Sequence, residues 1–171
     1  MIELFHGSFM KVDRPEVLKG RAKVDFGRGF YLTKLRLQAE SWAQTLAGRR
    51  PDGEAWLNIF EFDDIKAKAI LGARYKVFPE YNLEWLAYVV DCRNGGELQS
   101  RYAVVEGGVA NDNVIDTVED YEMGIITADQ ALGQLRYKKV NHQLAILDQS
   151  VIDSCLEFVE AKVVQEASYA R

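Results

Sequence analysis

The chain has few of the residues that build cross-linked or metal-stabilised domains. It holds two cysteines, Cys92 and Cys155, and two histidines among 171 residues. Two cysteines without CxxC spacing exclude a disulfide framework, and so few histidines make a structural zinc site unexpected. We therefore expect no metal, and we expect both thiols to be reduced packing residues on helices of a cytoplasmic protein.

Long apolar runs and an excess of positive charge are also missing. No stretch reaches about 18 apolar residues, and the segment Met1 to Ser8 lacks the basic flank of an export signal. We therefore expect no membrane span and no export. Lys and Arg number 21 against 26 Asp and Glu, which gives a net charge of -5. This balance excludes a general positive field for non-specific binding of nucleic acid.

The residues that are present describe an ordinary globular protein. Hydrophobic residues make up 48% of the chain and charged residues 27%, with 13 Gly and only 3 Pro. This composition supports a sizeable core, and no repeat, linker or low-complexity tract divides the chain. We predict one α+β domain over residues 1–171.

Hydrophobic periodicity predicts the elements of this domain. Strands are expected at Ile2 to His6, Phe30 to Thr33, Trp56 to Phe62, Tyr102 to Val105 and Val140 to Leu147. Helices are expected after a Thr33 cap up to Gly48, around Leu83 to Val90, after the Thr127–Gln130 capping box, and from Ser150 through Ile152, Cys155, Leu156, Val159 and Val163. Phe26, Phe30 and Trp42 are predicted core residues.

A search for chemical motifs is mostly negative. The chain has no P-loop, no HExxH and no nucleophile elbow. Gly27-Arg28-Gly29 precedes a predicted strand, whereas the glycine fingerprint of a dinucleotide-binding fold precedes a helix. Polar or aromatic residues remain at strand ends: His6, Tyr31, Asn141 and Gln143. Each also has a structural interpretation, as a hydrogen-bonded core histidine, a core tyrosine, or polar residues on a solvated strand face.

Several segments together resemble a known family. They are Leu4 to Ser8, Asp25 to Thr33, Gln38-Ala39 with Trp42-Ala43, Val109 to Asp112, and Asn141 to Leu144. In this order they resemble bacterial ADP-ribosyltransferase-like proteins, and more closely a toxin-related branch catalogued as a domain of unknown function. The resemblance implies a split mixed β-sheet with flanking helices and an NAD cleft between its halves.

The resemblance also implies roles for individual residues. His6 would hydrogen-bond the nicotinamide ribose, the Gly7 backbone would hold the carboxamide, and Tyr31 would stack on the nicotinamide ring. Arg21 or Arg28 would meet the pyrophosphate. Ser8, Gly29 and Asn141 complete the expected cofactor-binding set, and His6, Tyr31 and Gln143 form the expected catalytic set.

Gln143 occupies the position that usually holds a glutamate in this superfamily. Cleavage of the nicotinamide–ribose bond builds positive charge on the sugar, and an amide stabilises that charge less than a carboxylate does. A carboxylate from elsewhere is an alternative, and Glu84, Glu106 and Asp112 are the candidates.

The sequence therefore leads to one leading hypothesis and two alternatives. The first is an NAD-dependent ADP-ribosyltransferase-like toxin or effector, with an unidentified target and a cognate antitoxin as partners. The second is a catalytically silent module that binds NAD or ADP-ribose. The third is a protein-interaction domain on the same scaffold.

Overall fold

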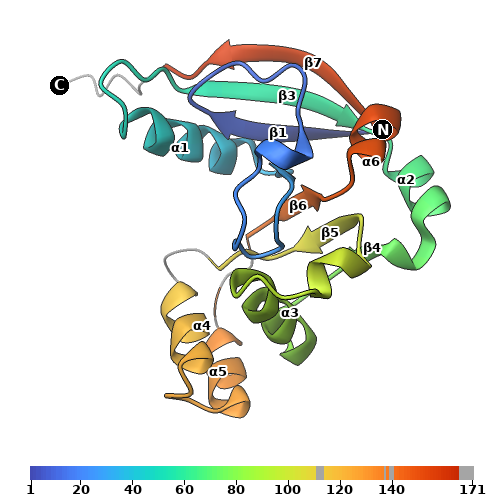
Figure 1. Cartoon of the computed structure of the whole chain (residues 1–171). Coiled ribbons are helices and arrows are strands. Elements are labelled where there is room, and N and C mark those ends of the chain that lie inside the picture. The colour runs from blue at the N-terminus through green and yellow to red at the C-terminus, as the bar shows by residue number, and fades with distance from the viewer. Residues whose placement is uncertain (111–113, 137, 139–140, 166–171) are drawn as a thin grey trace.

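The protein folds around two β-sheets, seen in a computed structural model that describes residues 1–110, 114–136, 138 and 141–165. The first sheet has the order β1-β3-β7 and is antiparallel (Figure 1). Its strands are β1 (Ile2–Ser8), β3 (Trp56–Phe62) and β7 (Leu156–Val163). The central strand β3 is rich in aromatic and aliphatic residues, which suit a strand covered on both faces.

The second sheet is mixed and has the order β2-β6-β5-β4. Its strands are β2 (Phe30–Leu32), β6 (Gln143–Ile146), β5 (Val104–Gly107) and β4 (Tyr75–Val77). Only the pair β4–β5 is parallel, while β6 runs antiparallel to both of its neighbours. The α+β class is thus confirmed, with a mixed sheet beside an antiparallel one.

The main core lies between the two sheets. Leu4, Phe60 and Phe62 of the first sheet belong to the same buried cluster as Leu144 and Ile146 of the second. The predicted core residues Phe26 and Phe30 are buried, at 0% and 7% exposure. The sheets share this core, so the ends of β1, β2 and β6 are held close together.

Helices cover the outer faces of both sheets. Helix α1 (Arg36–Ala47) packs on the first sheet through a small cluster that includes Phe5, Ala39 and Leu57. The second sheet is covered by α3 (Leu83–Arg93), α4 (Ile115–Glu122) and α5 (Ala128–Leu135), and Figure 1 shows α4 and α5 together at one end of the molecule. The predicted helices α3 and α5 are confirmed, including the Thr127–Gln130 capping box.

Helix α1 differs from the prediction in its start and in its buried face. Thr33 pairs with Phe5, and its hydroxyl accepts a hydrogen bond from the Leu35 amide, so the helix begins only at Arg36. Trp42 is 41% exposed, and its assignment to the core was wrong. The face against the sheet consists of alanines, because α1 lies too close to β1 for a large side chain there.

The predicted terminal helix is the largest error. Helix α6 (Gln149–Cys155) begins after the Asp148 cap and ends at Cys155, and the chain then continues as strand β7. The spacing of apolar residues after Cys155 fits a helix, but the open edge of β3 offers backbone hydrogen bonds and a contact between Phe60 and Phe158, whose ring centroids lie 5.6 Å apart. Tertiary pairing therefore decides the structure here.

The prediction missed several short elements. They are α2 (Asp64–Leu71), α4, β4 and the 3-10 turns at Gly72–Arg74 and Leu98–Arg101. A further 3-10 turn at Val17–Lys19 ends at Gly20. Strand β5 begins two residues later than expected. Cys92 in α3 and Cys155 in α6 are free and buried, as predicted. No helix within the described ranges is long and apolar enough to cross a membrane.

Candidate functional site

The two sheets meet and then separate at one point along β1 and β2. Phe5 and Thr33 exchange two backbone hydrogen bonds, at 2.8 and 2.9 Å. The next pair of a regular antiparallel ladder would be Gly7 with Tyr31. Instead, the Nδ1 atom of His6 lies 2.7 Å from the Tyr31 carbonyl oxygen. We call this opening, bounded by His6, Gly7 and Tyr31, the sheet split.

The hydrogen bond of His6 fixes the state of its ring. A carbonyl oxygen only accepts, so Nδ1 carries the proton and Nε2 keeps its lone pair. Burial lowers the pKa of His6 below its usual 6.5, and the bond to Tyr31 opposes this effect. The ring also packs on Phe30, with centroids 4.5 Å apart. A neutral ring with Nε2 as an acceptor is suited to a hydroxyl group, and no described residue bonds that atom.

Gly7 has its backbone toward the split and its Cα against helix α1. A Cβ at this position would lie 2.0 Å from the Ala39 carbonyl oxygen, so only glycine fits. The backbone N–H and C=O of Phe5 bond Thr33 and not β3. Alternate residues of a strand direct these groups to the same edge, so the N–H and C=O of Gly7 also point to the β2 side of β1. None of the loop and turn hydrogen bonds between described residues uses these two groups. The split thus presents one donor and one acceptor.

Tyr31 closes the glycine-rich turn before β2. Its hydroxyl donates to the Gly27 carbonyl oxygen and accepts from the Phe26 amide at 3.3 Å. Gly27 adopts φ +86°, which disfavours other residues. Burial raises the pKa of Tyr31 far above its usual range, so the phenol stays protonated. The positive charge of the exposed Arg21 opposes this rise in pKa.

Gln143 lies on the same face of the second sheet as Tyr31. Tyr31 pairs with Ala145, which lies two residues after Gln143 on β6. The side chains of Tyr31 and Gln143 are therefore diagonal neighbours, with Cα atoms roughly 7–8 Å apart. Gln143 is half-buried and no described residue bonds its side chain. The structure thus brings His6, Tyr31 and Gln143 to adjoining positions on β1, β2 and β6.

The other predicted site residues lie at varied distances from the split. Ser8 ends β1 and is buried, and Asn141 lies just before β6 and is half-buried. Gly29 packs on the Ile146 carbonyl at the opposite end of β6, and this contact alone explains a glycine. Arg28 is exposed, and its amide bonds Gln99.

The three candidate carboxylates also differ. Glu84 forms an ion pair with Lys76 and its side chain is 59% exposed, outside the split. Asp112 lies outside the described residues. Glu106 is the one that lies near Gln143, because its neighbour Gly107 pairs directly with Gln143.

Glu106 is the centre of a polar network that the sequence did not reveal. Its Oε1 accepts from Lys34 Nζ and from His142 Nε2, the latter at 3.0 Å, and its Oε2 accepts from the Tyr75 hydroxyl at 3.2 Å. The hydrogen bonds and charges of His142 and Lys34, led by His142, outweigh burial and lower the pKa of Glu106 to about 2. The carboxylate is therefore ionised at every physiological pH. His142 stands next to Gln143 in sequence, which was the only available signal.

Asp25 is a second residue whose role sequence reasoning missed. Its carboxylate accepts from Arg93 Nη1 at 3.1 Å and from the Ala110 amide at 2.7 Å. It thus joins the loop before β2, the end of α3 and the segment after β5. Burial raises its pKa, and the two hydrogen-bond partners oppose this rise.

Comparison with protein families gives one match. The family described as a protein of unknown function (DUF3990) matches residues 2–158. The chain belongs to the DUF3990 family. The matched region contains every strand described above except residues 159–163 of β7. No curated protein and no solved structure gave a match.

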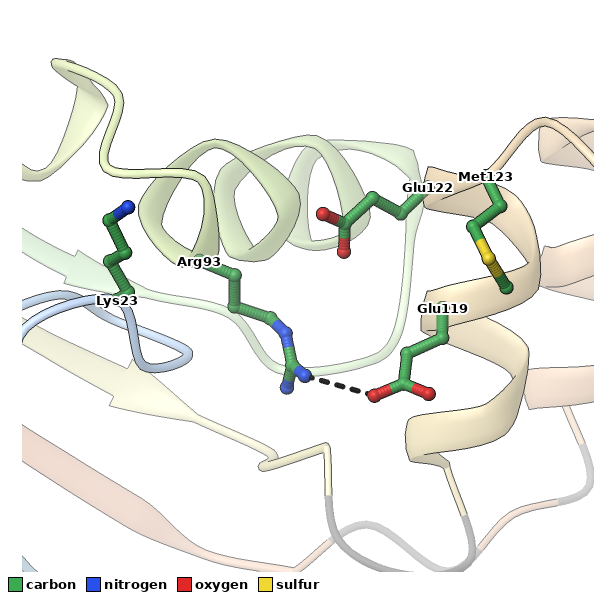
Figure 2. A pocket seen from close by; sticks show the side chains of 5 residues that line it. All are labelled: Lys23, Arg93, Glu119, Glu122 and Met123. Atoms are coloured by element: carbon green, nitrogen blue, oxygen red, sulfur yellow. Dashed lines mark hydrogen bonds and ion pairs between the residues drawn. The ribbon is translucent and has the colours of Figure 1, made fainter.

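One hollow on the described part of this DUF3990 domain has a lining that does not include the residues of the split. It has a volume of about 350 Å³ and is lined by Lys23, Arg93, Glu119, Glu122 and Met123 (Figure 2). Figure 2 shows Arg93 pointing across it to Glu119, and these side chains form an ion pair at 3.4 Å. No predicted site residue lines this hollow, and its mixed charges select no one ligand class.

Proposed function

We propose that this protein is an NAD-dependent ADP-ribosyltransferase-like enzyme with the split mixed-sheet fold of that superfamily. It would transfer ADP-ribose from NAD to a target macromolecule and release nicotinamide. The observation that carries this proposal is the sheet split. There, the Nε2 atom of His6 and the backbone of Gly7 present unused hydrogen-bonding groups beside Tyr31 and Gln143.

These groups suit the nicotinamide riboside end of NAD. A primary carboxamide offers one acceptor and two donors, and the Gly7 N–H and C=O offer the complementary pair. The His6 Nε2 atom would accept a ribose hydroxyl proton. The Tyr31 ring offers a flat apolar surface for the nicotinamide, and Arg21 brings positive charge for the pyrophosphate.

The chemistry would proceed by breaking the bond between nicotinamide and C1 of the ribose. Nicotinamide leaves with the bonding electron pair, and a nucleophile of the target attacks C1 and loses its proton. The carbonyl oxygen of Gln143 would orient a ribose hydroxyl and face the developing positive charge with a partial charge only. We therefore expect a slower reaction than a carboxylate at this position would give.

The biological setting is part of the same proposal. The sequence resemblance supports a cytoplasmic bacterial toxin or effector, with NAD as substrate, an unidentified target and a cognate antitoxin as partners. No metal is needed for the proposed step. The resemblance alone supports the setting, since a scaffold does not fix a biological role.

A second candidate function is a silent module that binds NAD or ADP-ribose. Gln143 favours this alternative, because an amide at this position holds a ribose hydroxyl but lacks the full negative charge. Both functions predict NAD binding at the sheet split. They differ only in whether nicotinamide is released.

Substitution of Gln143 by glutamate separates these two functions. If the amide limits an existing reaction, Gln143→Glu raises nicotinamide release by about ten- to a hundredfold. Release is followed by chromatography at saturating NAD. The matched control is Gln44→Glu, the same change at an exposed position of α1. Absence of release from the natural chain, with NAD still bound, would favour the silent module, and release created only in Gln143→Glu would show that the amide is the reason for the silence.

A further inference from the structure

We propose that Glu106 is a positioning residue that acts through His142 to hold Gln143 in place at the sheet split. The catalytic part of this inference rests on the proposed function. The structural part, that Glu106 fixes the beginning of β6, stands without it.

His142 is held by three different segments of the chain. Its Nδ1 accepts from the Lys34 amide at 3.0 Å, and its Nε2 lies 3.0 Å from Glu106 Oε1. Its backbone carbonyl accepts from Gln38 Nε2 at 2.9 Å. The residue before Gln143 is therefore tied to the turn after β2, to β5 and to α1.

The hydrogen bonds of the His142 ring determine its tautomer. An amide N–H only donates, so Nδ1 of His142 must carry the lone pair and Nε2 the proton. Nε2–H then donates to Glu106, which as an ionised carboxylate only accepts. A charged acceptor makes this bond stronger than a neutral one, and it fixes the ring plane as well as the tautomer.

The hydrogen bond from Gln38 to His142 leaves another polar atom of Gln38 in an unfavourable environment. Its Nε2 donates to the His142 carbonyl, and this leaves Gln38 Oε1 buried with no partner among the described residues. A buried acceptor without a partner is unfavourable. Rotation of the amide would place Oε1 against the His142 carbonyl, so the bond to His142 determines its orientation.

The network acts on Gln143 from the opposite face of the sheet. Successive residues of a strand point to opposite faces, so His142 and Gln143 side chains diverge. Glu106 stands opposite Leu144 and therefore shares the face of His142. Glu106 accordingly cannot replace the missing carboxylate beside Tyr31, but it can keep Gln143 from shifting.

The test compares Glu106→Ala and Glu106→Gln with the control Glu84→Gln, which removes a carboxylate charge from an ion pair elsewhere. We expect Glu106→Ala to lower kcat for nicotinamide release about tenfold and to leave KM for NAD within about twofold, since His6 and Gly7 are untouched. Glu106→Gln keeps an oxygen for His142, so we expect it to recover part of the loss. Glu84→Gln should change neither constant.

A measurement without NAD tests the structural part. Amide hydrogen exchange of β6, Gln143–Ile146, should be at least about tenfold faster in Glu106→Ala than in Glu84→Gln, because β6 loses its anchor. If Glu106→Ala does not fold, Glu106→Gln decides, with an expected smaller rise in exchange and about a threefold lower kcat. Unchanged exchange and unchanged kcat in the folded variant would overturn the inference, as would a change confined to KM.

The two proposals fail in distinguishable ways. If the natural chain neither binds nor cleaves NAD, the proposed function is refuted. Faster exchange at β6 in the Glu106 variants would then still establish Glu106 as the anchor of that strand. If the natural chain cleaves NAD and the Glu106 variants match it in kcat, only the positioning role is refuted.

Discussion

At the scale of the residue, the two ring nitrogens of His6 bear on two interpretations that sequence reasoning treated as alternatives, a structural one and a functional one. Its Nδ1–H holds the Tyr31 carbonyl and so replaces the missing ladder bond between β1 and β2. Its Nε2 atom has no partner among the described residues, and under the proposed function this atom binds the ligand. Because the two interpretations concern different nitrogens, two substitutions can separate them.

We predict opposite effects for His6→Asn and His6→Gln. The asparagine amide nitrogen reaches the place of Nδ1, so His6→Asn should retain most of the stability and lose NAD binding by at least about tenfold. Glutamine reaches the place of Nε2 and loses the bond to Tyr31, at a cost of about 1–2 kcal/mol in the free energy of unfolding. Denaturant unfolding and calorimetric titration with NAD measure the two effects. Equal NAD affinity in His6→Asn and the natural chain would leave His6 a purely structural residue.

Gly7 gives a second prediction at this scale. The Cβ of Gly7→Ala would meet the Ala39 carbonyl at 2.0 Å, so α1 must move away from β1. We expect a loss of about 2–4 kcal/mol in the free energy of unfolding, measured with urea. The control is Gly133→Ala in α5, where a Cβ meets nothing within 4 Å and helix propensity favours alanine. A Gly7→Ala variant as stable as this control would contradict the packing of α1 on β1.

At the scale of the element, local signals predicted some segments and not others. Helix α5 has its own capping box, and β3 has the composition of a buried strand, so both were predictable. Strand β7 was not, because its apolar spacing also fits a helix and its partner β3 lies about a hundred residues earlier in the chain. The edge of a sheet is a property of the fold and leaves no local mark in the sequence.

The position of β7 on β3 predicts a difference between two proline substitutions. His6 and Asn58 form a hydrogen-bonded pair between β1 and β3, so the backbone groups of Asn58 point to β1. The backbone N–H and C=O of the preceding residue, Leu57, therefore point to β7, where Leu57 pairs with Lys162. Lys162→Pro removes a ladder bond and should cost about 2–3 kcal/mol, whereas Ala161→Pro removes an outward amide and should cost less. Thermal unfolding of both variants measures this difference. Equal losses, as expected inside a helix, would contradict β7.

At the scale of the whole molecule, two groups make stability depend on pH in the same direction. The pKa of His6 is lowered from 6.5 and that of Glu106 from 4.5 to about 2. In each case the unfolded chain binds its proton first, so stability is complete above the unfolded pKa and falls as the pH decreases. Asp25, whose pKa is raised, acts in the opposite direction.

We therefore predict a loss of stability in two steps on acidification. The first step lies below pH 6.5 and should be absent in His6→Asn. The second lies between about pH 4.5 and 2 and should shrink by about 1–2 kcal/mol in Glu106→Gln, allowing for solvent screening at this partly exposed site. Urea unfolding at several pH values measures both steps. A first step that persists in His6→Asn would show that another group is responsible.

The site was predictable only where a residue carries its own pattern. His6 before Gly7, and Tyr31 after the glycine-rich turn, carry local patterns that the sequence marks, although β1 continues past His6 to Ser8 where its end was expected at His6. Glu106, Lys34 and Gln38 converge on His142 from β5, from the turn after β2 and from α1, and nothing in their local sequence shows this. The sheet split itself arises from a side chain taking the place of a backbone bond, which no periodicity encodes.

The central claim is that the sheet split binds NAD and cleaves it. Proton NMR of NAD mixed with the purified protein tests both parts in one sample, through broadening of the nicotinamide signals and the growth of free nicotinamide. We predict broadening and slow release, both of them lost in His6→Ala, and a release that is also lost in Gln143→Ala. Sharp NAD signals that the protein leaves unchanged would contradict the claim.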